Sequence, residues 1–146
     1  MKLTLQILML ALISFYSFGQ DSIVCSDYKN GTFKLTDPQS KKVCIITRKD
    51  NVQTERIQDS DEVYDFNITW IDDCTYTVTP TASTASRNKE MLKLGTMTVA
   101  ITPATDTSYV QSIRVANSPK FRRKDTVYIV DRQENKEKRT EENIED

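Results

Sequence analysis

The strongest constraint on the fold is a strict alternation of large apolar and polar residues in the middle of the chain. It runs through residues 64–70, breaks at residues 71–74 and resumes over residues 74–79. Successive side chains of a β-strand point to opposite faces, so this period of two predicts two amphipathic strands joined by a tight turn. The predicted buried face of this hairpin comprises Tyr64, Phe66, Ile68, Trp70, Cys74, Tyr76 and Val78.

Residue types that favour β-strands also dominate the apolar segments in the rest of the chain. Thr, Val, Ile and Tyr dominate the apolar segments, and these residue types favour strands. We predict six further strands, at residues 32–35, 42–48, 52–57, 96–101, 108–116 and 126–130.

Four segments between these strands carry weaker signals. Residues 80–86 are polar and predict a loop, as do residues 103–107. Residues 88–94 predict either one or two helical turns ended by Gly95 or the entry to the next strand. Residues 117–124 predict a basic connection.

Eight strand candidates joined mostly by short turns predict an all-β fold, an antiparallel meander rather than βαβ units. Such a meander closes as a lipocalin-like barrel or packs as a β-sandwich. The barrel is the preferred prediction, because closure leaves no unpaired edge strand.

The two ends of the chain differ from this central part. Residues 1–19 combine Lys2, an uncharged apolar run of about 16 residues and a small residue at position 19. This pattern predicts a signal peptide, cleaved to leave Gln20 at the new N-terminus. The run is shorter than the ~20 residues that span a bilayer, so no transmembrane span is expected after cleavage, and an uncleaved anchor is the alternative. We therefore expect export to the periplasm or secretion.

Residues 132–146 hold four basic, six acidic and only one apolar residue. They cannot bury enough surface to order themselves, so a charged, disordered tail is predicted, with a solvated helix as the alternative. The predicted all-β domain is thus residues 20–131.

The composition argues against several function classes. The chain has no histidine, which excludes His bases, Ser-His-Asp and Cys-His nucleophile systems and His metal sites. A net charge of -1 provides no overall field to attract nucleic acid. Asp72 and Asp73, with Asp61 and Glu62, match no calcium-loop spacing, and turn chemistry explains them more simply. No enzymatic activity, cofactor, metal or nucleic-acid partner is expected.

The three cysteines allow three single pairings. Cys44 lies in the most apolar strand, where a free thiol behaves as a small hydrophobe. Cys25 and Cys74 lie where the edge of a core is expected, so a Cys25–Cys74 disulfide is favoured for an exported chain, with three reduced cysteines as the alternative. A catalytic thiol is not expected, because no histidine could activate it.

Two surfaces are candidate binding sites. The apolar residues of the central strands either line a ligand cavity or fill an ordinary core; they are Phe33, Tyr64, Phe66, Ile68, Trp70, Tyr76 and Val78. A basic cluster around Phe121 either binds a polyanion, such as lipopolysaccharide phosphate or nucleic acid, or is a solvated loop. Its members are Lys120, Arg122, Arg123 and Lys124.

Several short motifs carry a family resemblance. They are Cys25, Gly31-Thr32-Phe33, Ile46-Thr47-Arg48 with Gln53-Thr54-Glu55, Ile68-Thr69-Trp70 with Cys74-Thr75-Tyr76, and Leu94-Gly95 followed by Tyr109. In this order they resemble a group of small exported flavobacterial proteins of unknown function, whose members often carry the label DNA topoisomerase IV. The resemblance covers roughly residues 25–115 and implies no established activity.

The topoisomerase label conflicts with the residues of this chain. A topoisomerase needs a nucleotide site, acidic metal ligands and a tyrosine nucleophile in a nucleic-acid-binding domain. The chain has no Gly-rich phosphate loop, is too short for those parts and begins with a predicted export signal. The exported lipocalins' Gly-x-Trp signature is also absent, and Gly31-Thr32-Phe33 only loosely resembles it.

Two functional hypotheses follow. The first is an exported, non-catalytic barrel that binds a small apolar molecule or a lipid. The alternative is a structural or interaction protein of the cell envelope with a filled core. A cavity behind the face that carries Trp70 would favour the first hypothesis, and a filled core there would favour the alternative.

Overall fold

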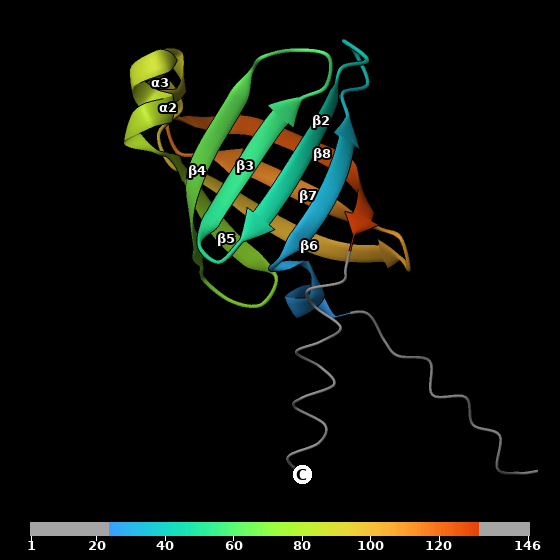
Figure 1. Ribbon diagram of the computed structural model, residues 1–146. Helices are drawn as coiled ribbons and strands as arrows, with labels where there is room; N and C mark the ends of the chain where they lie inside the picture. Colours follow the sequence, from blue (N-terminus) through green and yellow to red (C-terminus); the bar gives the residue numbers. More distant parts are fainter. Residues whose placement is uncertain (1–23, 132–146) are drawn as a thin grey trace, which may run out of the picture.

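The computed structural model describes residues 24–131, so the predicted signal peptide and charged tail lie outside the described residues. Eight antiparallel strands follow one another around a closed barrel, and the last strand pairs with the first (Figure 1). The all-β meander is confirmed, and it closes as a barrel rather than packing as a sandwich. The strands are β1 (Gly31–Thr36), β2 (Val43–Lys49), β3 (Val52–Ile57), β4 (Val63–Trp70), β5 (Thr75–Pro80), β6 (Met97–Thr105), β7 (Ser108–Val115) and β8 (Ser118–Asp131).

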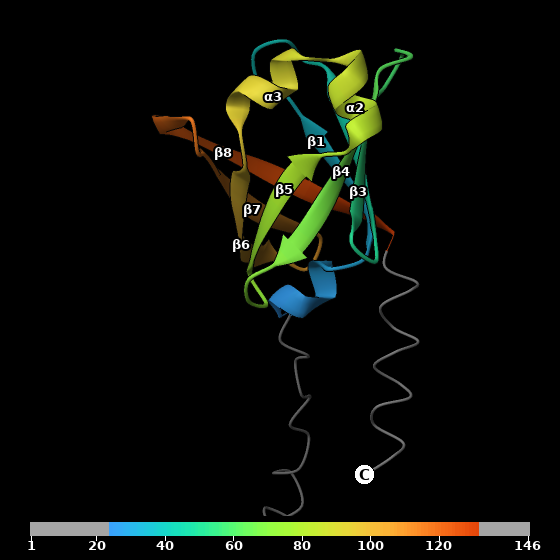
Figure 2. The same ribbon diagram turned by 90° about the vertical axis from the view of Figure 1, so that its left-hand side faces the viewer.

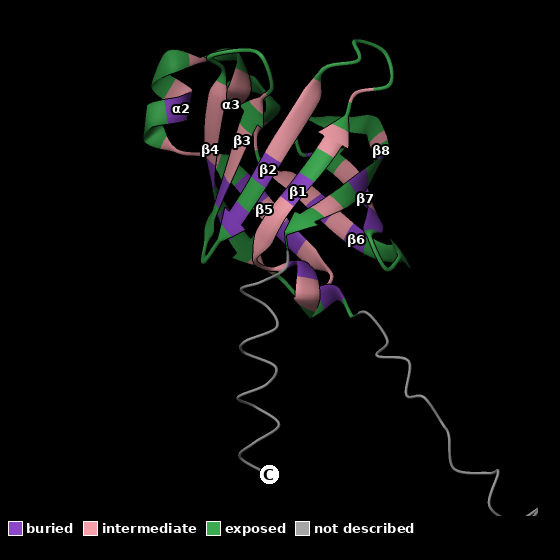
Figure 3. Cartoon of the chain, turned by 45° about the vertical axis from the view of Figure 1, so that its right-hand side comes forward, coloured by how far each residue is buried: buried purple, intermediate pink, exposed green. Residues whose placement is uncertain are grey.

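The central hairpin forms as the alternation predicts. Ile68 lies opposite Val78, and Trp70 opposite Tyr76, in the register of β4 with β5. The turn between them is closed by the Asp72 side chain, which accepts a hydrogen bond from the backbone N–H of Cys74 at 2.8 Å. Figure 3 shows buried and exposed positions alternating along the strands. All seven residues of the predicted face lie in the core or pack against it.

The polar segment after β5 is helical, which corrects the loop prediction for residues 80–86. Helix α2 (Ala82–Arg87) is capped by Thr81, whose side chain accepts a hydrogen bond from the N–H of Thr84. The buried Thr84 hydroxyl in turn accepts from the N–H of Asp65 on β4 at 2.8 Å. A second helix, α3 (Glu90–Leu94), realises the predicted helical turns and ends at Gly95, whose φ of 68° is in the left-handed region.

Two predicted connections are parts of strands. Strand β6 extends into the predicted loop at residues 103–107, because Pro103 pairs with Tyr109 of β7. Strand β8 starts at Ser118, so the predicted basic connection at residues 117–124 belongs to the barrel wall. A register shift beside Val115 absorbs the extra residues at the start of β8. Cross-strand pairing at these positions overrides weak local propensity.

The two ends of the barrel are built differently (Figures 1 and 2). A short 3-10 helix, η1 (Cys25–Tyr28), lies at the end we call the base, and α2 and α3 lie at the opposite end, which we call the helix end. A disulfide between Cys25 and Cys74 ties η1 to the β4–β5 turn, which confirms the predicted pairing and leaves Cys44 as a free thiol. None of the helices described is long and apolar enough to cross a membrane.

Candidate functional site

A buried arginine organises the base of the barrel. Arg48 of β2 is only 1% exposed, and its guanidinium makes four hydrogen bonds. Its Nε donates to Oε1 of Gln53 at 2.8 Å, and Nη1 donates to the backbone carbonyl of Tyr28 at 3.0 Å. Its Nη2 donates to the hydroxyls of Tyr76 at 2.7 Å and Tyr109 at 2.8 Å. This one side chain thereby joins β2 to β3, η1, β5 and β7.

Aromatic rings enclose the same guanidinium. Its central carbon lies 4.8 Å from the ring centroid of Phe33, 5.0 Å from that of Tyr76 and 5.6 Å from that of Tyr109. Cation–π attraction of this kind strengthens when the cation is removed from water. Tyr28 of η1 packs on Tyr109 at 4.7 Å between centroids. Each of these rings is at most 1% exposed, so the base is filled by protein side chains.

The side-chain amide of Gln53 links the guanidinium of Arg48 to the carboxylate of Glu55. Gln53 donates from Nε2 to Oε1 of Glu55 at 2.7 Å, on the inner face of β3. Burial raises the pKa of Glu55, while the Gln53 hydrogen bond and the positive charge of Arg48 act in the opposite direction. Burial also raises the pKa values of the Tyr76 and Tyr109 hydroxyls, so both stay neutral and serve as acceptors for the guanidinium. The network stabilises a buried charge and holds the strands in register.

A signal in the sequence could have identified this cluster. Arg48 follows Cys44 and Ile46 at a spacing of two, so it lies on the buried phase of its strand. Gln53 is likewise the buried position at the start of β3. A charged residue on the buried phase of an apolar strand requires internal partners, because an isolated buried charge is strongly destabilising. The polar residues on that phase mark a network, although its partners cannot be read from the strand itself.

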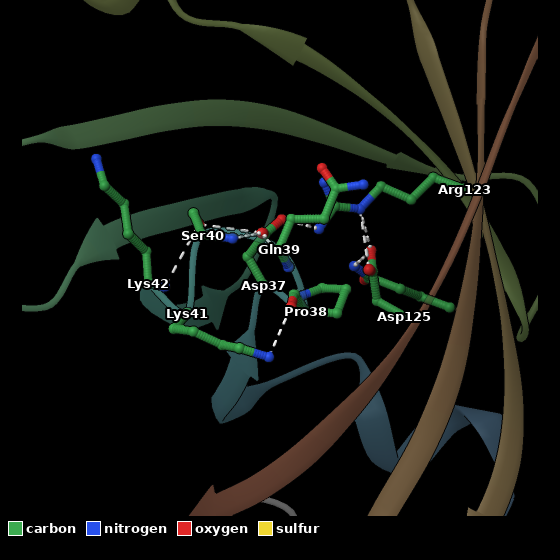
Figure 4. A network of polar contacts seen from close by, with 9 residues as sticks. Asp37, Pro38, Gln39, Ser40, Lys41, Lys42, Arg123 and Asp125 are labelled. Atoms are coloured by element: carbon green, nitrogen blue, oxygen red, sulfur yellow. Dashed lines mark hydrogen bonds and ion pairs between the residues drawn. The ribbon is translucent and has the colours of Figure 1, made fainter.

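A second polar network lies inside the wall nearer the helix end (Figure 4). Nε of Arg123 donates to both carboxylate oxygens of Asp125, at 2.9 and 2.8 Å, and its Nη2 donates to Oδ2 of Asp37 at 2.9 Å. Gln111 of β7 contributes a longer contact of 3.5 Å to Asp125. Arg123 is therefore occupied inside the wall, which separates it from the rest of the predicted basic cluster. Lys120, Arg122 and Lys124 are exposed.

Asp37 also organises the turn that follows β1. Its Oδ1 accepts hydrogen bonds from the backbone N–H of Ser40 at 2.7 Å, the Ser40 hydroxyl at 3.0 Å and the N–H of Gln39 at 3.0 Å. These hydrogen bonds, those from Ser40 above all, together with Arg123 lower the pKa of Asp37 to about 2. The turn and the wall of β8 are thus connected by one carboxylate.

Replacing Asp37 with asparagine is expected to remove an acid-sensitive contribution to stability. The folded-state pKa lies below the ordinary value of 3.8, so the carboxylate stabilises the fold above that value, and the effect is lost as the pH falls towards 2. Urea unfolding should show wild type more stable than Asp37→Asn at pH 6, with the two converging between about pH 4 and pH 2. Ser40→Ala should move the acid transition to higher pH. Parallel pH profiles for wild type and Asp37→Asn would contradict the assignment.

The inner wall at the helix end is less tightly covered than the base. Leu35, Cys44, Tyr64, Met97 and Ile113 face inward and pack against the core, yet each keeps part of its surface exposed. Burial, followed by the charge of Glu55, raises the pKa of the Cys44 thiol to about 12. The thiol is therefore protonated and a poor nucleophile. The interior is thus filled at the base and partly reached by solvent at the helix end.

The seven candidate lining residues are distributed along the whole interior. Phe33 and Tyr76 belong to the base cluster, and Phe66, Ile68 and Val78 are buried in the core. Only Tyr64 belongs to the partly exposed wall at the helix end. Trp70 lies at the base, where its ring stacks on Tyr76 at 4.7 Å and faces the ammonium group of Lys29 at 5.4 Å.

The acidic residues of the β4–β5 turn serve the fold. Asp73 forms a 2.7 Å ion pair with Lys29, and Asp72 closes the turn. Over residues 24–131 no group of three or more Cys, Asp or Glu residues is placed to hold a metal ion. Comparisons of the chain with protein-family models, with curated proteins and with solved structures return no significant match. The fold and site therefore define an eight-stranded antiparallel barrel with a polar, filled base.

Proposed function

We propose that this is an exported, non-catalytic, lipocalin-like barrel that takes up a small apolar molecule or a lipid at the helix end of its interior. The observation that carries the proposal is the gradient of exposure along the inner wall. Arg48 and the aromatic rings around it at the base are at most 1% exposed, whereas inward-facing apolar residues at the helix end remain partly exposed. Partly exposed apolar side chains inside a barrel are the surface that an apolar ligand would cover.

The apolar part of this inner wall, beside the network of Arg123, Asp125 and Asp37, suits an apolar ligand. Leu35, Met97 and Ile113 provide aliphatic surface, and transfer of such surface out of water supplies binding free energy without directional bonds. Met91 of α3 packs against the same core from above, while Leu92 beside it is 56% exposed. Apolar residues of α3 thus extend the inner wall towards solvent, where a ligand would enter.

Three observations support export and a non-catalytic role. The Cys25–Cys74 disulfide is compatible with an oxidising compartment. The Cys44 thiol is kept protonated by burial, which raises its pKa to about 12. Arg48, Gln53 and Glu55 are linked to one another by hydrogen bonds. None of these groups is poised for proton transfer or nucleophilic attack.

The second candidate function is a structural or interaction protein of the envelope with a filled core. The dense cluster around Arg48 favours it, because a filled base alone would satisfy a purely structural role. The two candidates differ in what occupies the helix end: solvent that a ligand can displace, or side chains.

Cys44→Phe separates the two candidates, with Thr47→Phe as its matched control. Cys44 faces inward and Thr47 is exposed on the same strand. A ligand-accommodating interior takes up the phenyl ring with a stability change within about 0.5 kcal/mol. The variant then binds a neutral lipophilic dye or a fatty acid at least tenfold more weakly than wild type.

Binding is followed by dye emission and calorimetry, because Trp70 lies at the base and is a poor reporter. Wild type and Thr47→Phe should bind saturably, with a negative heat-capacity change. A filled core predicts the opposite pair of results. Wild type then fails to bind, and Cys44→Phe loses about 1–3 kcal/mol of stability through overpacking.

A further inference from the structure

Positively charged side chains from separate parts of the sequence lie together on the outer face of the β7–β8 hairpin. Arg114 of β7 lies directly opposite Arg122 of β8, and both side chains are exposed. Lys124, two residues further along β8, is exposed on the same face, and Lys120 is exposed beside the turn. Like charges directly opposite one another in a sheet are destabilising, so this arrangement has a cost for the fold itself.

No carboxylate of the described residues compensates this face. Within residues 24–131, none of these four cations forms an ion pair with a carboxylate. Arg122 instead donates from Nη1 to the backbone carbonyls of Pro119 at 2.6 Å and Phe121 at 2.7 Å, which holds its guanidinium at the turn. Arg123, between Arg122 and Lys124 in sequence, is absent from this face, because Asp125 and Asp37 hold it in the wall.

An exposed aromatic residue lies next to two of these cations in the sequence. Phe121 is 43% exposed between Lys120 and Arg122. Figure 2 shows the β7–β8 turn projecting from the barrel wall beside α3, and Asn117 of the turn anchors it by donating to the carbonyl of Lys93 at 3.0 Å. A ring that is held at a projecting turn and flanked by cations can enter the boundary between lipid headgroups and acyl chains. The cations would then meet the phosphate groups.

We propose that the β7–β8 hairpin, through the exposed Arg114, Lys120, Phe121, Arg122 and Lys124, docks the protein on a membrane surface rich in anionic phospholipid. Charge complementarity selects the anionic surface, and the exposed Phe121 distinguishes a lipid surface from a soluble polyanion. The proposal is independent of ligand uptake by the barrel, because the docking residues lie on the outer wall.

The test is sedimentation of the purified protein with vesicles of phosphatidylcholine alone or mixed with phosphatidylglycerol. Wild type should bind only the mixed vesicles, and more weakly as salt is raised. The triple variant Arg114→Gln/Arg122→Gln/Lys124→Gln should bind roughly a hundredfold more weakly, about fivefold for each charge. The matched control is Lys49→Gln/Arg56→Gln/Lys89→Gln, which removes three exposed cations from β2, β3 and the N-cap of α3 and should bind like wild type.

The variant Phe121→Ser tests the contribution of the aromatic ring. It should lose most of the vesicle binding while its four cations remain. Vesicle binding by Phe121→Ser that equals wild type would overturn the proposal, as would an equal loss in the two triple variants.

Binding of wild type to a single-stranded oligonucleotide but not to anionic vesicles would assign the face to nucleic acid instead. All substituted side chains are exposed, so unchanged unfolding midpoints verify that every variant is folded.

Discussion

Arg48→Ala is expected to lower the free energy of unfolding by about 3–5 kcal/mol, the largest effect of any single substitution in the barrel. The variant leaves the buried Tyr76 and Tyr109 hydroxyls without the guanidinium donor, and Oε1 of Gln53 keeps only the longer hydrogen bond from the Tyr76 hydroxyl. Buried polar groups that lose a partner keep their full desolvation cost. The truncation also removes a side chain that lies against three aromatic rings. Urea unfolding followed by far-ultraviolet circular dichroism measures the loss.

Two further variants separate the electrostatic part of this effect from packing. Arg48→Met retains much of the volume but removes the charge, which leaves Glu55 inside the barrel with Arg123 as the remaining cation that favours its ionised form. Adding Glu55→Gln should therefore recover part of the loss, with a coupling free energy of about 0.5–3 kcal/mol in a double-mutant cycle. The control Arg56→Ala, an exposed arginine on the adjacent strand, should change stability by no more than about 0.5 kcal/mol. An Arg48→Ala protein as stable as this control would refute the structural role of the cluster.

Reduction of the Cys25–Cys74 disulfide is expected to lower the free energy of unfolding by about 4 kcal/mol. The two cysteines are 49 residues apart, and opening a loop of that length restores conformational entropy to the unfolded chain. The bond also holds η1, which carries Tyr28, against the β4–β5 turn. Thermal unfolding with and without dithiothreitol measures the effect.

Cys44→Ala is the control for this prediction. Cys44 is the free cysteine, so the variant should show the same sensitivity to dithiothreitol as wild type. Cys25→Ser/Cys74→Ser should match reduced wild type and become insensitive to the reductant. Three alkylatable thiols in the native protein, or equal melting temperatures with and without reductant, would contradict the expectation.

The strands were predictable because their signal is local. Alternation in residues 64–70 and 74–79 determines which side chains of β4 and β5 face inward, whatever the other strands do. The helix α2 was missed because its six residues include no large apolar side chain, and its capping signal, Thr81, resembles ordinary loop chemistry. The start of β8 was missed for the opposite reason: its basic residues have weak strand propensity, and pairing with β7 holds them in the sheet.

The candidate site was only partly predictable. Cysteine position within strands and turns was sufficient to favour Cys25 with Cys74. The sequence grouped Arg123 with Lys120, Arg122 and Lys124, whereas the strand geometry turns Arg123 inward. It also brings Arg114 of β7 opposite Arg122. Trp70 was placed correctly against the core, yet its position at the base, beneath Lys29, depends on which end of the barrel η1 covers.

The strand phases and the meander could be read from the amino-acid sequence, because they follow from spacing along one segment or between adjacent ones. The Cys25–Cys74 pairing was favoured from the place of each cysteine in its segment. Which polar side chains meet inside the barrel depends on the tertiary structure. Arg48 and Tyr109, which share a hydrogen bond, are 61 residues apart. Closure between β1 and β8 brings such groups together, and their mutual hydrogen bonds replace the water that each loses on burial. That exchange depends on three-dimensional proximity, for which no local pattern in the chain provides a signal.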